Sequence, residues 1–240
     1  MISKSFELAK IDIKKFDYYL FYGENSGLKN EIIDKKFKVK FKENTFYYEE
    51  NEILKEEKKF FDQILSKSFF EKEKLILISR VTDKIFKIVE EIIDRKIKDL
   101  LIIFIAEKLE KKSKIRSLFE KDKNLMCVPF YLDTYQSLSY LVNDYFKKIK
   151  INLFKEILNI IIERSNYDRQ NLKNELNKIQ SFTKNKQKVI MEDIIKLTNL
   201  AENNNISELV DFCLAKNEKK TLRILNENNF YSEDSMLIIR

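Results

Sequence analysis

A glycine and a lysine occur at the spacing of a phosphate-binding loop. The stretch from Tyr18 to Glu31 reads YYLFYGENSGLKNE, an apolar run followed by Gly23 and, six residues later, by Lys29. In the GxxxxGK[ST] motif, backbone amides surround the phosphates, the lysine neutralises them, and the last hydroxyl binds magnesium. The spacing therefore raises the question of whether this turn binds a nucleotide.

The residues beside the lysine lack two features of that chemistry. Leu28 stands where the motif has its second glycine, Asn30 stands where it has the hydroxyl, and Gly27 comes one position too early. A side chain at position 28 crowds a backbone that must wrap closely around a phosphate, and an amide replaces the magnesium-binding hydroxyl poorly. We therefore expect the loop of Gly23, Gly27, Leu28, Lys29 and Asn30 not to support ATP hydrolysis.

The other residues that a nucleotide site needs are also missing. A Walker B strand ends in a pair of carboxylates that hold magnesium and orient water, whereas two apolar runs here end in Ser79-Arg80 and Ala106-Glu107. The chain has no histidine and only two cysteines, far apart in sequence, so an imidazole or thiolate metal site is not expected. The sequence predicts no catalytic residue, no metal and no cofactor.

The first 130 or so residues alternate strand and helix patterns. Continuous apolar runs, typical of strands buried on both faces, predict strands at Tyr18–Tyr22, Leu75–Ser79, Leu100–Ala106 and Leu125–Val128. Helices are predicted at 28–36, 51–66 and 112–121, and after Thr82 as N-cap. The segment 37–48 is predicted to be extended, because Phe37, Val39 and Phe41 alternate with lysines. Together these patterns predict an α/β fold with a parallel sheet covered by helices.

Only helix patterns follow Pro129. Amphipathic segments predict helices at 138–149, 153–163, 169–182 and 191–199, with Asp168 as an N-cap. Further helices are predicted at 207–215 and 219–228, and the acidic residues of 232–235 indicate another helix start. We predict an α/β domain at 1–132, a small helical bundle at 133–200 and the start of a truncated third helical domain at 201–240.

Charge and composition narrow the function classes only slightly. The net charge is +7, from 46 Lys and Arg against 39 Asp and Glu, and a basic excess favours nucleic acid or acidic partners. The abundance of Lys, Ile, Asn and Phe also fits an AT-rich genome. A local basic cluster of candidate DNA contacts comprises Lys111, Lys112, Lys114 and Arg116. A cluster of this kind is more often a solvated surface.

The sequence gives no sign of a membrane segment or a disulfide framework. The longest apolar run, Leu100–Ala106, is far shorter than the ~20 residues of a membrane-spanning helix. The first residues, MISKSFELAKIDIKKF, lack the apolar core of a signal peptide. We therefore expect a cytoplasmic protein with no membrane partner, in which Cys127 and Cys213 are free thiols.

Taken in order, several stretches resemble the delta subunit of bacterial DNA polymerase III, a clamp-loader subunit. YYLFYGENSGLKNEII resembles the first strand and turn of that family, and Ser68-Phe69-Phe70 stands where the family has its clamp-binding residues. The remaining stretches that resemble the family are Asp99–Phe104 with Lys108-Leu109, Glu163–Asp168 with Leu172, Asn174–Ile179 and Asn205–Val210. Each motif alone is moderately specific, and their order along the chain is the stronger signal.

The resemblance implies an AAA+-like fold, a helical lid domain and a helical collar domain. It implies a subunit that opens the beta sliding clamp for loading onto primed DNA without hydrolysing ATP itself. The implied partners are the clamp, the tau/gamma and delta prime subunits and, through the complex, primed DNA. Nucleotidyltransferase activity would belong to the DNA-directed DNA polymerase holoenzyme. The implied clamp-binding residues are Ser68, Phe69 and Phe70, with phenylalanine where the family often has leucine.

Two function classes remain as alternatives. An active P-loop ATPase would bind ATP and magnesium tightly. A basic helical nucleic-acid-binding protein would bind DNA tightly without a clamp or other loader subunits, and that binding would weaken steeply with salt.

Overall fold

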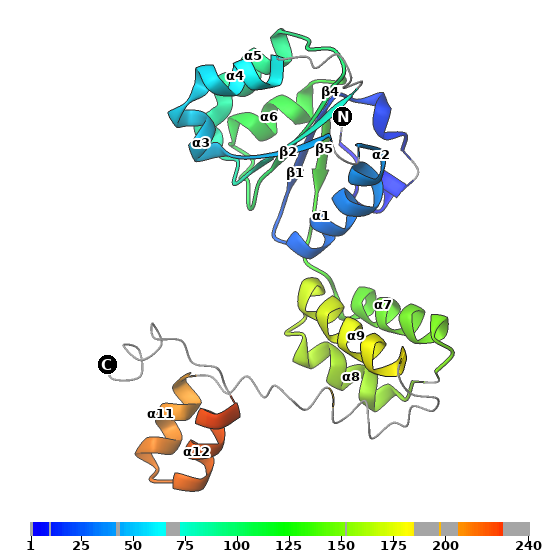
Figure 1. Cartoon of the computed structure of the whole chain (residues 1–240), viewed down its shortest axis with the longest axis vertical. Coiled ribbons are helices and arrows are strands. Elements are labelled where there is room, and N and C mark those ends of the chain that lie inside the picture. The colour runs from blue at the N-terminus through cyan, green and yellow to red at the C-terminus, as the bar shows by residue number, and fades with distance from the viewer. Residues whose placement is uncertain are drawn as a thin grey trace. The chain divides into compact units, whose positions relative to one another are not determined.

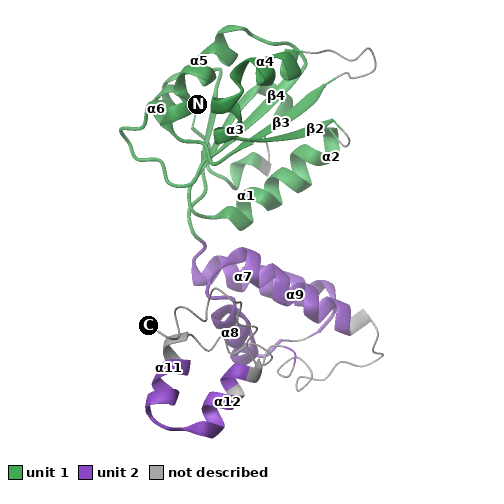
Figure 2. Cartoon of the chain, turned by 60° about the vertical axis from the view of Figure 1, so that its left-hand side comes forward, with its two compact units in different colours: residues 1–132 green, residues 133–240 purple. Residues whose placement is uncertain are grey.

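The computed structural model describes residues 2–9, 11–41, 44–65, 73–151, 153–184, 197 and 206–227. The chain divides into two compact units, Met1–Leu132 (unit 1) and Asp133–Arg240 (unit 2), which are coloured separately in Figure 2. The proposed clamp contact Ser68-Phe69-Phe70 lies outside the described residues, as do the predicted helix start at 232–235 and all but residue 197 of the predicted helix at 191–199.

Unit 1 is built on a five-stranded parallel sheet (Figure 1). Its strands are β1 (Tyr18–Tyr22), β2 (Thr45–Glu49), β3 (Lys74–Ser79), β4 (Leu100–Ile105) and β5 (Met126–Pro129), in the order β2-β3-β4-β1-β5. All five residues of β1 are buried, as are most of β3 and β4, because helices cover both faces of the sheet. The predicted α/β fold is confirmed.

The two faces of the sheet have separate apolar cores. Residues of α3 (Glu50–Lys55), α4 (Glu57–Leu65), α5 (Phe86–Asp94) and α6 (Lys114–Lys121) pack against one face. Against the other face pack the 3₁₀ turns η1 (Glu7–Ala9) and η2 (Ile13–Lys15), α1 (Ser26–Ile32), the π-helix η3 (Ile33–Lys38) and the short α2 (Val39–Phe41). Alternate residues of each strand enter opposite cores: Tyr19 and Phe21 face Phe37 in edge-on ring contacts, whereas Leu20 lies in the first core.

The prediction of an extended segment from Phe37 to Tyr48 is wrong over its first part. The chain is helical as far as Phe41, and β2 begins only at Thr45. Ile33, Phe37 and Phe41 follow one another at intervals of four residues and are all buried, whereas Val39 is 64% exposed. Phe37 and Phe41 fit both a strand and a helix period, and the burial of Ile33 with them shows that the helix period applies.

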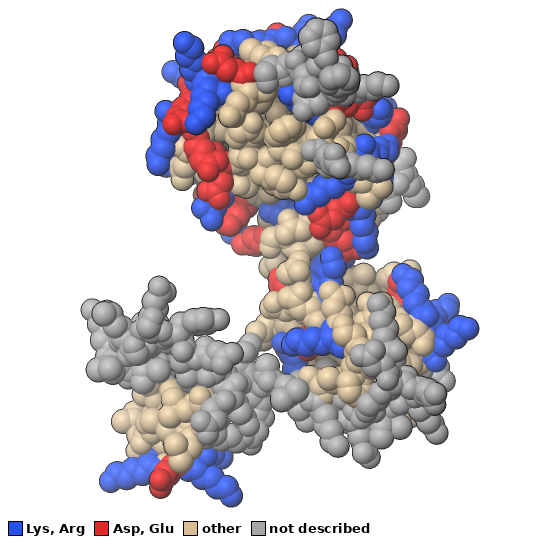
Figure 3. Space-filling model, viewed as in Figure 1, with Lys and Arg blue, Asp and Glu red and all other residues tan. Residues whose placement is uncertain are grey.

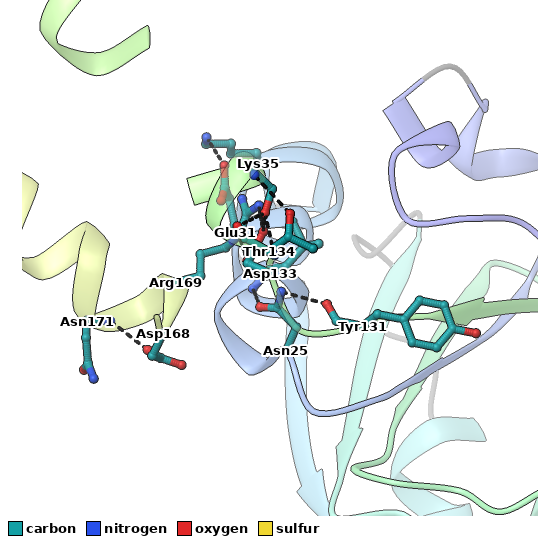
Figure 4. A network of polar contacts seen from close by, with 11 residues as sticks. Asn25, Glu31, Lys35, Tyr131, Asp133, Thr134, Asp168, Arg169 and Asn171 are labelled. Atoms are coloured by element: carbon teal, nitrogen blue, oxygen red, sulfur yellow. Dashed lines mark hydrogen bonds and ion pairs between the residues drawn. The ribbon is translucent and has the colours of Figure 1, made fainter. Parts of the chain in front are cut away.

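Unit 2 contains three helices around a core of its own: α7 (Tyr135–Lys148), α8 (Lys155–Arg164) and α9 (Arg169–Lys184). The Asp168 carboxylate accepts a hydrogen bond from the Asn171 amide at 2.8 Å, which confirms Asp168 as the N-cap of α9 (Figure 4). Arg169 donates from Nε and Nη2 to the two carboxylate oxygens of Asp133, at 2.7 and 2.8 Å, with both side chains largely buried. This bidentate pair fixes the start of α9 to Asp133, two residues before α7.

A helical hairpin follows in the described part of unit 2. It consists of α11 (Ile206–Leu214) and α12 (Glu218–Glu227), and Leu209 and Ile224 are its buried residues. Leu214, Leu222 and Leu225 remain exposed on it. No described helix of the chain combines the length and the apolar character that crossing a bilayer requires.

Candidate functional site

Gly23 begins the turn at the carboxyl end of β1 and packs directly against two neighbouring strand ends. Its φ angle is +122°, and its amide donates to the carbonyl oxygen of Glu107 at 2.7 Å. A β-carbon at this position would lie 2.1 Å from the carbonyl oxygen of Phe130. Glycine is therefore required for close backbone approach, and the turn is held against the residues that follow β4 and β5.

Lys29 turns its charged end into the protein. The residue is only 3% exposed, and its Nζ donates to the carbonyl oxygens of Gly23 and Ala106, each at 2.8 Å. Burial lowers the pKa of the ammonium, and the neighbouring charge of Glu107 opposes this shift in part. The lysine that neutralises phosphate in a working loop here bridges the ends of β1 and β4.

Asn25 is the N-cap of α1. Its Oδ1 accepts from the Leu28 amide at 2.9 Å, and its Nδ2 donates to the carbonyl oxygen of Tyr131 at 3.0 Å (Figure 4). The Asn25 amide itself donates to the carbonyl oxygen of Phe130 at 3.3 Å. The helix start, which would bind an anion in a phosphate loop, is thus capped by a side chain and tied to the segment after β5.

The other predicted loop residues also have structural positions. Gly27 is buried in the first turn of α1, Leu28 is partly buried against the core, and Asn30 is exposed. The sequence had placed Gly23 and Lys29 in one loop, and the structure confirms that they are in contact. It did not identify Asn25, although an asparagine directly before a predicted helix is a common N-cap.

The ends of β2 and β3 are joined through a buried carboxylate. Glu50 is 3% exposed and accepts hydrogen bonds from the amide and the Oγ1 of Thr82, at 2.5 and 2.7 Å. Thr82 in turn caps the 3₁₀ turn η4 (Asp83–Ile85) by accepting from the Lys84 amide. Glu50 fixes the loop after β3, where a nucleotide-hydrolysing enzyme has its metal-binding carboxylates, but it points its oxygens at backbone and hydroxyl donors.

Asp83 caps α6 from a different part of the chain. Its carboxylate accepts from Ser113 Oγ at 2.7 Å and from the amides of Lys114 and Ile115 at 3.1 Å each. Although desolvation raises the pKa of Asp83, these hydrogen bonds outweigh it, and the pKa is lowered overall. Sequence reasoning missed both Glu50 and Asp83, because their partners are about thirty residues away along the chain.

The four predicted DNA contacts lie in and just before α6, and they differ in exposure. Lys111, Lys112 and Lys114 are exposed, and Lys112 forms an ion pair with Glu110 at 2.9 Å. Arg116 is partly buried: it pairs with Glu120 at 2.8 Å and donates to the Leu109 carbonyl oxygen at 3.0 Å. Its guanidinium lies 4.9 Å from the centre of the Tyr22 ring. Arg116 therefore has a structural position in unit 1.

The described residues that flank Ser68-Phe69-Phe70 include the start of β3, which lies at the amino end of the strands, whereas Gly23 lies at the carboxyl end. The described chain stops at Leu65, the last residue of α4, and resumes at Glu73, directly before β3. Glu73 pairs with Lys14 at 2.7 Å, and the Lys74 amide donates to the Asp99 carbonyl oxygen. Because all strands are parallel, the amino ends of β3 and β4 lie together, away from the carboxyl ends that hold Gly23 and Lys29.

The two cysteines lie in different units and are both free. Cys127 is buried in β5, where desolvation raises the pKa of its thiol to about 12, while Cys213 is exposed on α11. Among the described residues, cysteine and acidic side chains nowhere gather in a group of three that could hold a metal ion.

A parallel sheet in the order β2-β3-β4-β1-β5, with a glycine turn after β1, defines an AAA+-like α/β fold whose phosphate loop is bound to its own backbone. Within this class, residues 19–128 match the family model of the DNA polymerase III delta subunit. The resemblance inferred from the order of the sequence motifs is thereby confirmed. The matched segment is a little under half of the 240-residue chain and contains both Gly23 and Ser68-Phe69-Phe70.

Solved structures agree in fold. The Bacillus subtilis DNA clamp loader delta protein YqeN is 17% identical, with a TM-score of 0.57 over 98% of this chain and 75% of that one. A structure of Thermotoga maritima RuvB is 13% identical, with a TM-score of 0.51 over 82% of this chain and 67% of that one. At these identities the similarity establishes the fold alone. No curated protein has a significantly similar sequence.

Proposed function

We propose that the chain is a clamp-loader delta subunit that binds the beta sliding clamp and favours its open form for loading onto primed DNA. The observation that carries the proposal is the delta-subunit family match over residues 19–128. The similarity in fold to the Bacillus subtilis clamp loader delta protein, over almost the whole chain, supports it. The tau/gamma and delta prime subunits are the partners that this function requires.

The proposal includes that the chain does not hydrolyse ATP, so the energy of ATP comes from partner subunits. Two observations support this part. Lys29 and the Gly23 amide are hydrogen-bonded to backbone carbonyls, and Asn25 caps the start of α1. The strands β3 and β4 are followed by Arg80 and Ala106 rather than by a carboxylate pair that could hold magnesium.

Clamp binding is assigned to Ser68, Phe69 and Phe70. Adjacent aromatic residues next to the charged stretch Glu71–Lys74 are suited to filling an apolar pocket on a partner, and large aromatic anchors commonly dominate binding energy. In this mechanism the energy of filling that pocket favours the clamp conformation that fits the two rings. Binding to the clamp should then require no ATP.

The test measures the affinity of the chain for surface-immobilised beta clamp from the same organism, with and without Mg-ATP. The double variant Phe69→Ala, Phe70→Ala should lose at least tenfold in affinity, because two anchors are removed. Phe6→Ala is the matched control, since Phe6 is a 70% exposed phenylalanine of the same unit, and it should bind as the wild type does. Unchanged binding by the double variant would contradict the assignment of clamp binding to Phe69 and Phe70.

A second part of the proposal concerns DNA. Lys111, Lys112 and Lys114 are exposed and are assigned as weak backbone contacts within the loaded complex, while Arg116 is left out because of its bonds within unit 1. A triple Lys→Gln variant should lower the salt dependence of DNA binding by the assembled loader. Tight DNA binding by the isolated chain would instead favour a nucleic-acid-binding protein.

A further inference from the structure

β2 forms a lateral edge of the sheet. In the part of the chain that the structure describes, it pairs with β3 alone, in parallel register from Thr45 to Glu49. Its sequence, TFYYE, has no proline or glycine, and aromatic residues of this kind favour strands. Edge strands are usually blunted by proline, bulges or covering segments, because an edge is a template for pairing with another chain.

The backbone of β2 alternates between β3 and the edge. The Leu75 amide donates to the Asn44 carbonyl oxygen, so the next residues that bond to β3 are Phe46 and Tyr48. The amide and carbonyl of Tyr47 consequently point away from β3. Those of Glu49 point the same way, but the Glu49 amide already donates to the Glu52 side chain. Tyr47 therefore marks the position where an added strand would pair.

A pocket adjoins this edge on the side of α3 and α4. It has a volume of about 340 Å³, and Tyr48, Ile53 and Phe60 supply its apolar lining. The rest of the lining is polar and carries both signs of charge, from Glu52, Lys55, Glu56, Lys59 and Gln63. Tyr48 belongs to β2 and directly follows Tyr47, so the pocket adjoins the strand next to the residue whose backbone points outward.

The surface over β2 combines aromatic rings with lysine side chains, since Lys38 lies over Tyr47 and Lys74 over Phe46. Figure 3 shows an uncharged area near the centre of unit 1, in the region where Figure 1 places β2, with charged side chains around it. Tyr47 of β2 is 61% exposed, and the ammonium of Lys38 lies 5.2 Å from the centre of its ring. The exposed ring of Tyr47 can contact an apolar side chain of a partner.

We infer that the edge of β2 and the adjoining pocket bind an extended segment of another protein, which adds to the sheet as a sixth strand. The main chain of that segment would pair with Tyr47, and one large apolar side chain would enter the pocket lined by Tyr48, Ile53 and Phe60. Main-chain pairing supplies affinity in this mode of recognition, and the side-chain pocket supplies selectivity. This site is separate from Ser68-Phe69-Phe70 and does not depend on clamp binding.

Selection from a phage-displayed library of random linear peptides on the full chain tests the proposal. Selected peptides should carry a large apolar residue and no proline at the paired positions, and they should protect the Tyr47 amide from hydrogen exchange. Tyr47→Pro removes the outward amide together with the ring, and it should lower their affinity at least tenfold while leaving the β2–β3 pairing intact. Tyr47→Thr keeps the amide and is the matched control.

A pocket variant keeps the test valid if proline disturbs the strand. Glu56→Trp adds a large side chain at the rim, on a residue whose carboxylate is fully exposed, and should also lower affinity at least tenfold. Glu56→Gln should bind normally. The proposal is overturned if no peptide is selected, if selected peptides bind all variants equally, or if light scattering shows that Tyr47→Pro merely dissociates a dimer of the chain.

Discussion

The turn from Gly23 to Lys29 lies at the carboxyl end of the sheet, and β2 forms a lateral edge of it. The polar groups of these two regions have different partners. At the turn, a lysine ammonium, a glycine amide and an asparagine side chain all bond to atoms of unit 1 itself. At β2, the backbone of Tyr47 points outward, and a pocket lined by both apolar and charged residues lies beside it. The polar groups of the turn have partners within unit 1, whereas the amide and carbonyl of Tyr47 face away from the sheet, and it is at Tyr47 that we place a binding site.

The largest expected effect comes from filling the space at Gly23. Gly23→Ala should lower the free energy of unfolding by about 3 kcal/mol or more, since it adds left-handed strain to a clash with the Phe130 carbonyl.

Tyr47→Pro should lower the free energy of unfolding by less than about 1 kcal/mol, because the lost amide lies outside the β2–β3 ladder. Urea denaturation measures both.

Gly27→Ala is the control for the glycine itself. Gly27 has ordinary helical geometry in α1, so its substitution should change stability by no more than about 1 kcal/mol. If Gly23→Ala were as mild as Gly27→Ala, the turn would not be held against β5 as the structure has it, and the contrast with β2 would fail.

Lys29→Met is expected to have an intermediate effect. Two buried carbonyl oxygens lose their donor, which costs about 1–3 kcal/mol each, and the relief of burying no ammonium offsets part of this. We expect a net loss of about 2 kcal/mol in urea denaturation. Calorimetry with Mg-ATP should show no binding for either protein. A stable variant that loses ATP binding present in the wild type would identify Lys29 as a nucleotide ligand instead.

Asp83→Asn should have a smaller effect than Lys29→Met. The folded-state pKa of Asp83 is lowered below 3.8, so its carboxylate contributes stability that is present above that pH and is lost as pH falls through the folded pKa. At neutral pH the variant should be less stable by about 1 kcal/mol, as for other helix caps. The difference between the proteins should shrink in acid. A difference that stays constant down to pH 2 would contradict the capping role.

The sheet and most helices could be predicted from local pattern alone. The runs YYLFY, LILI and LLIIFI are apolar because both faces of those strands are buried, and Asp168 caps its helix as expected. The segment from Phe37 to Phe41 was misassigned because residues four apart satisfy a period of two as well as a helical one. Val39, exposed at 64%, is the residue that breaks the strand interpretation.

The sequence shows how the turn departs from a phosphate motif, but it does not show the hydrogen-bond partners of the residues in the turn. Leu28 and Asn30 are visible departures from a phosphate motif, but the partners of Lys29 and Asn25 are not: Ala106 and Tyr131 lie about eighty to a hundred residues away. Sequence spacing reports which residue types share a loop. It does not report where a flexible lysine points, because that depends on which strands become neighbours in the sheet.

The double attachment of Asn25 has an evolutionary consequence. A descendant carrying Leu28→Gly and Asn30→Thr would restore the letters of a phosphate motif, yet Asn25 would still cap α1 and join it to Tyr131, and Lys29 would still bind Gly23 and Ala106. Recovering a nucleotide site would require changes after β4 and β5 as well, each costing stability before any ligand is gained. The contacts of Asn25 and Lys29 therefore separate this turn from a phosphate-binding loop by more than the residues of the motif.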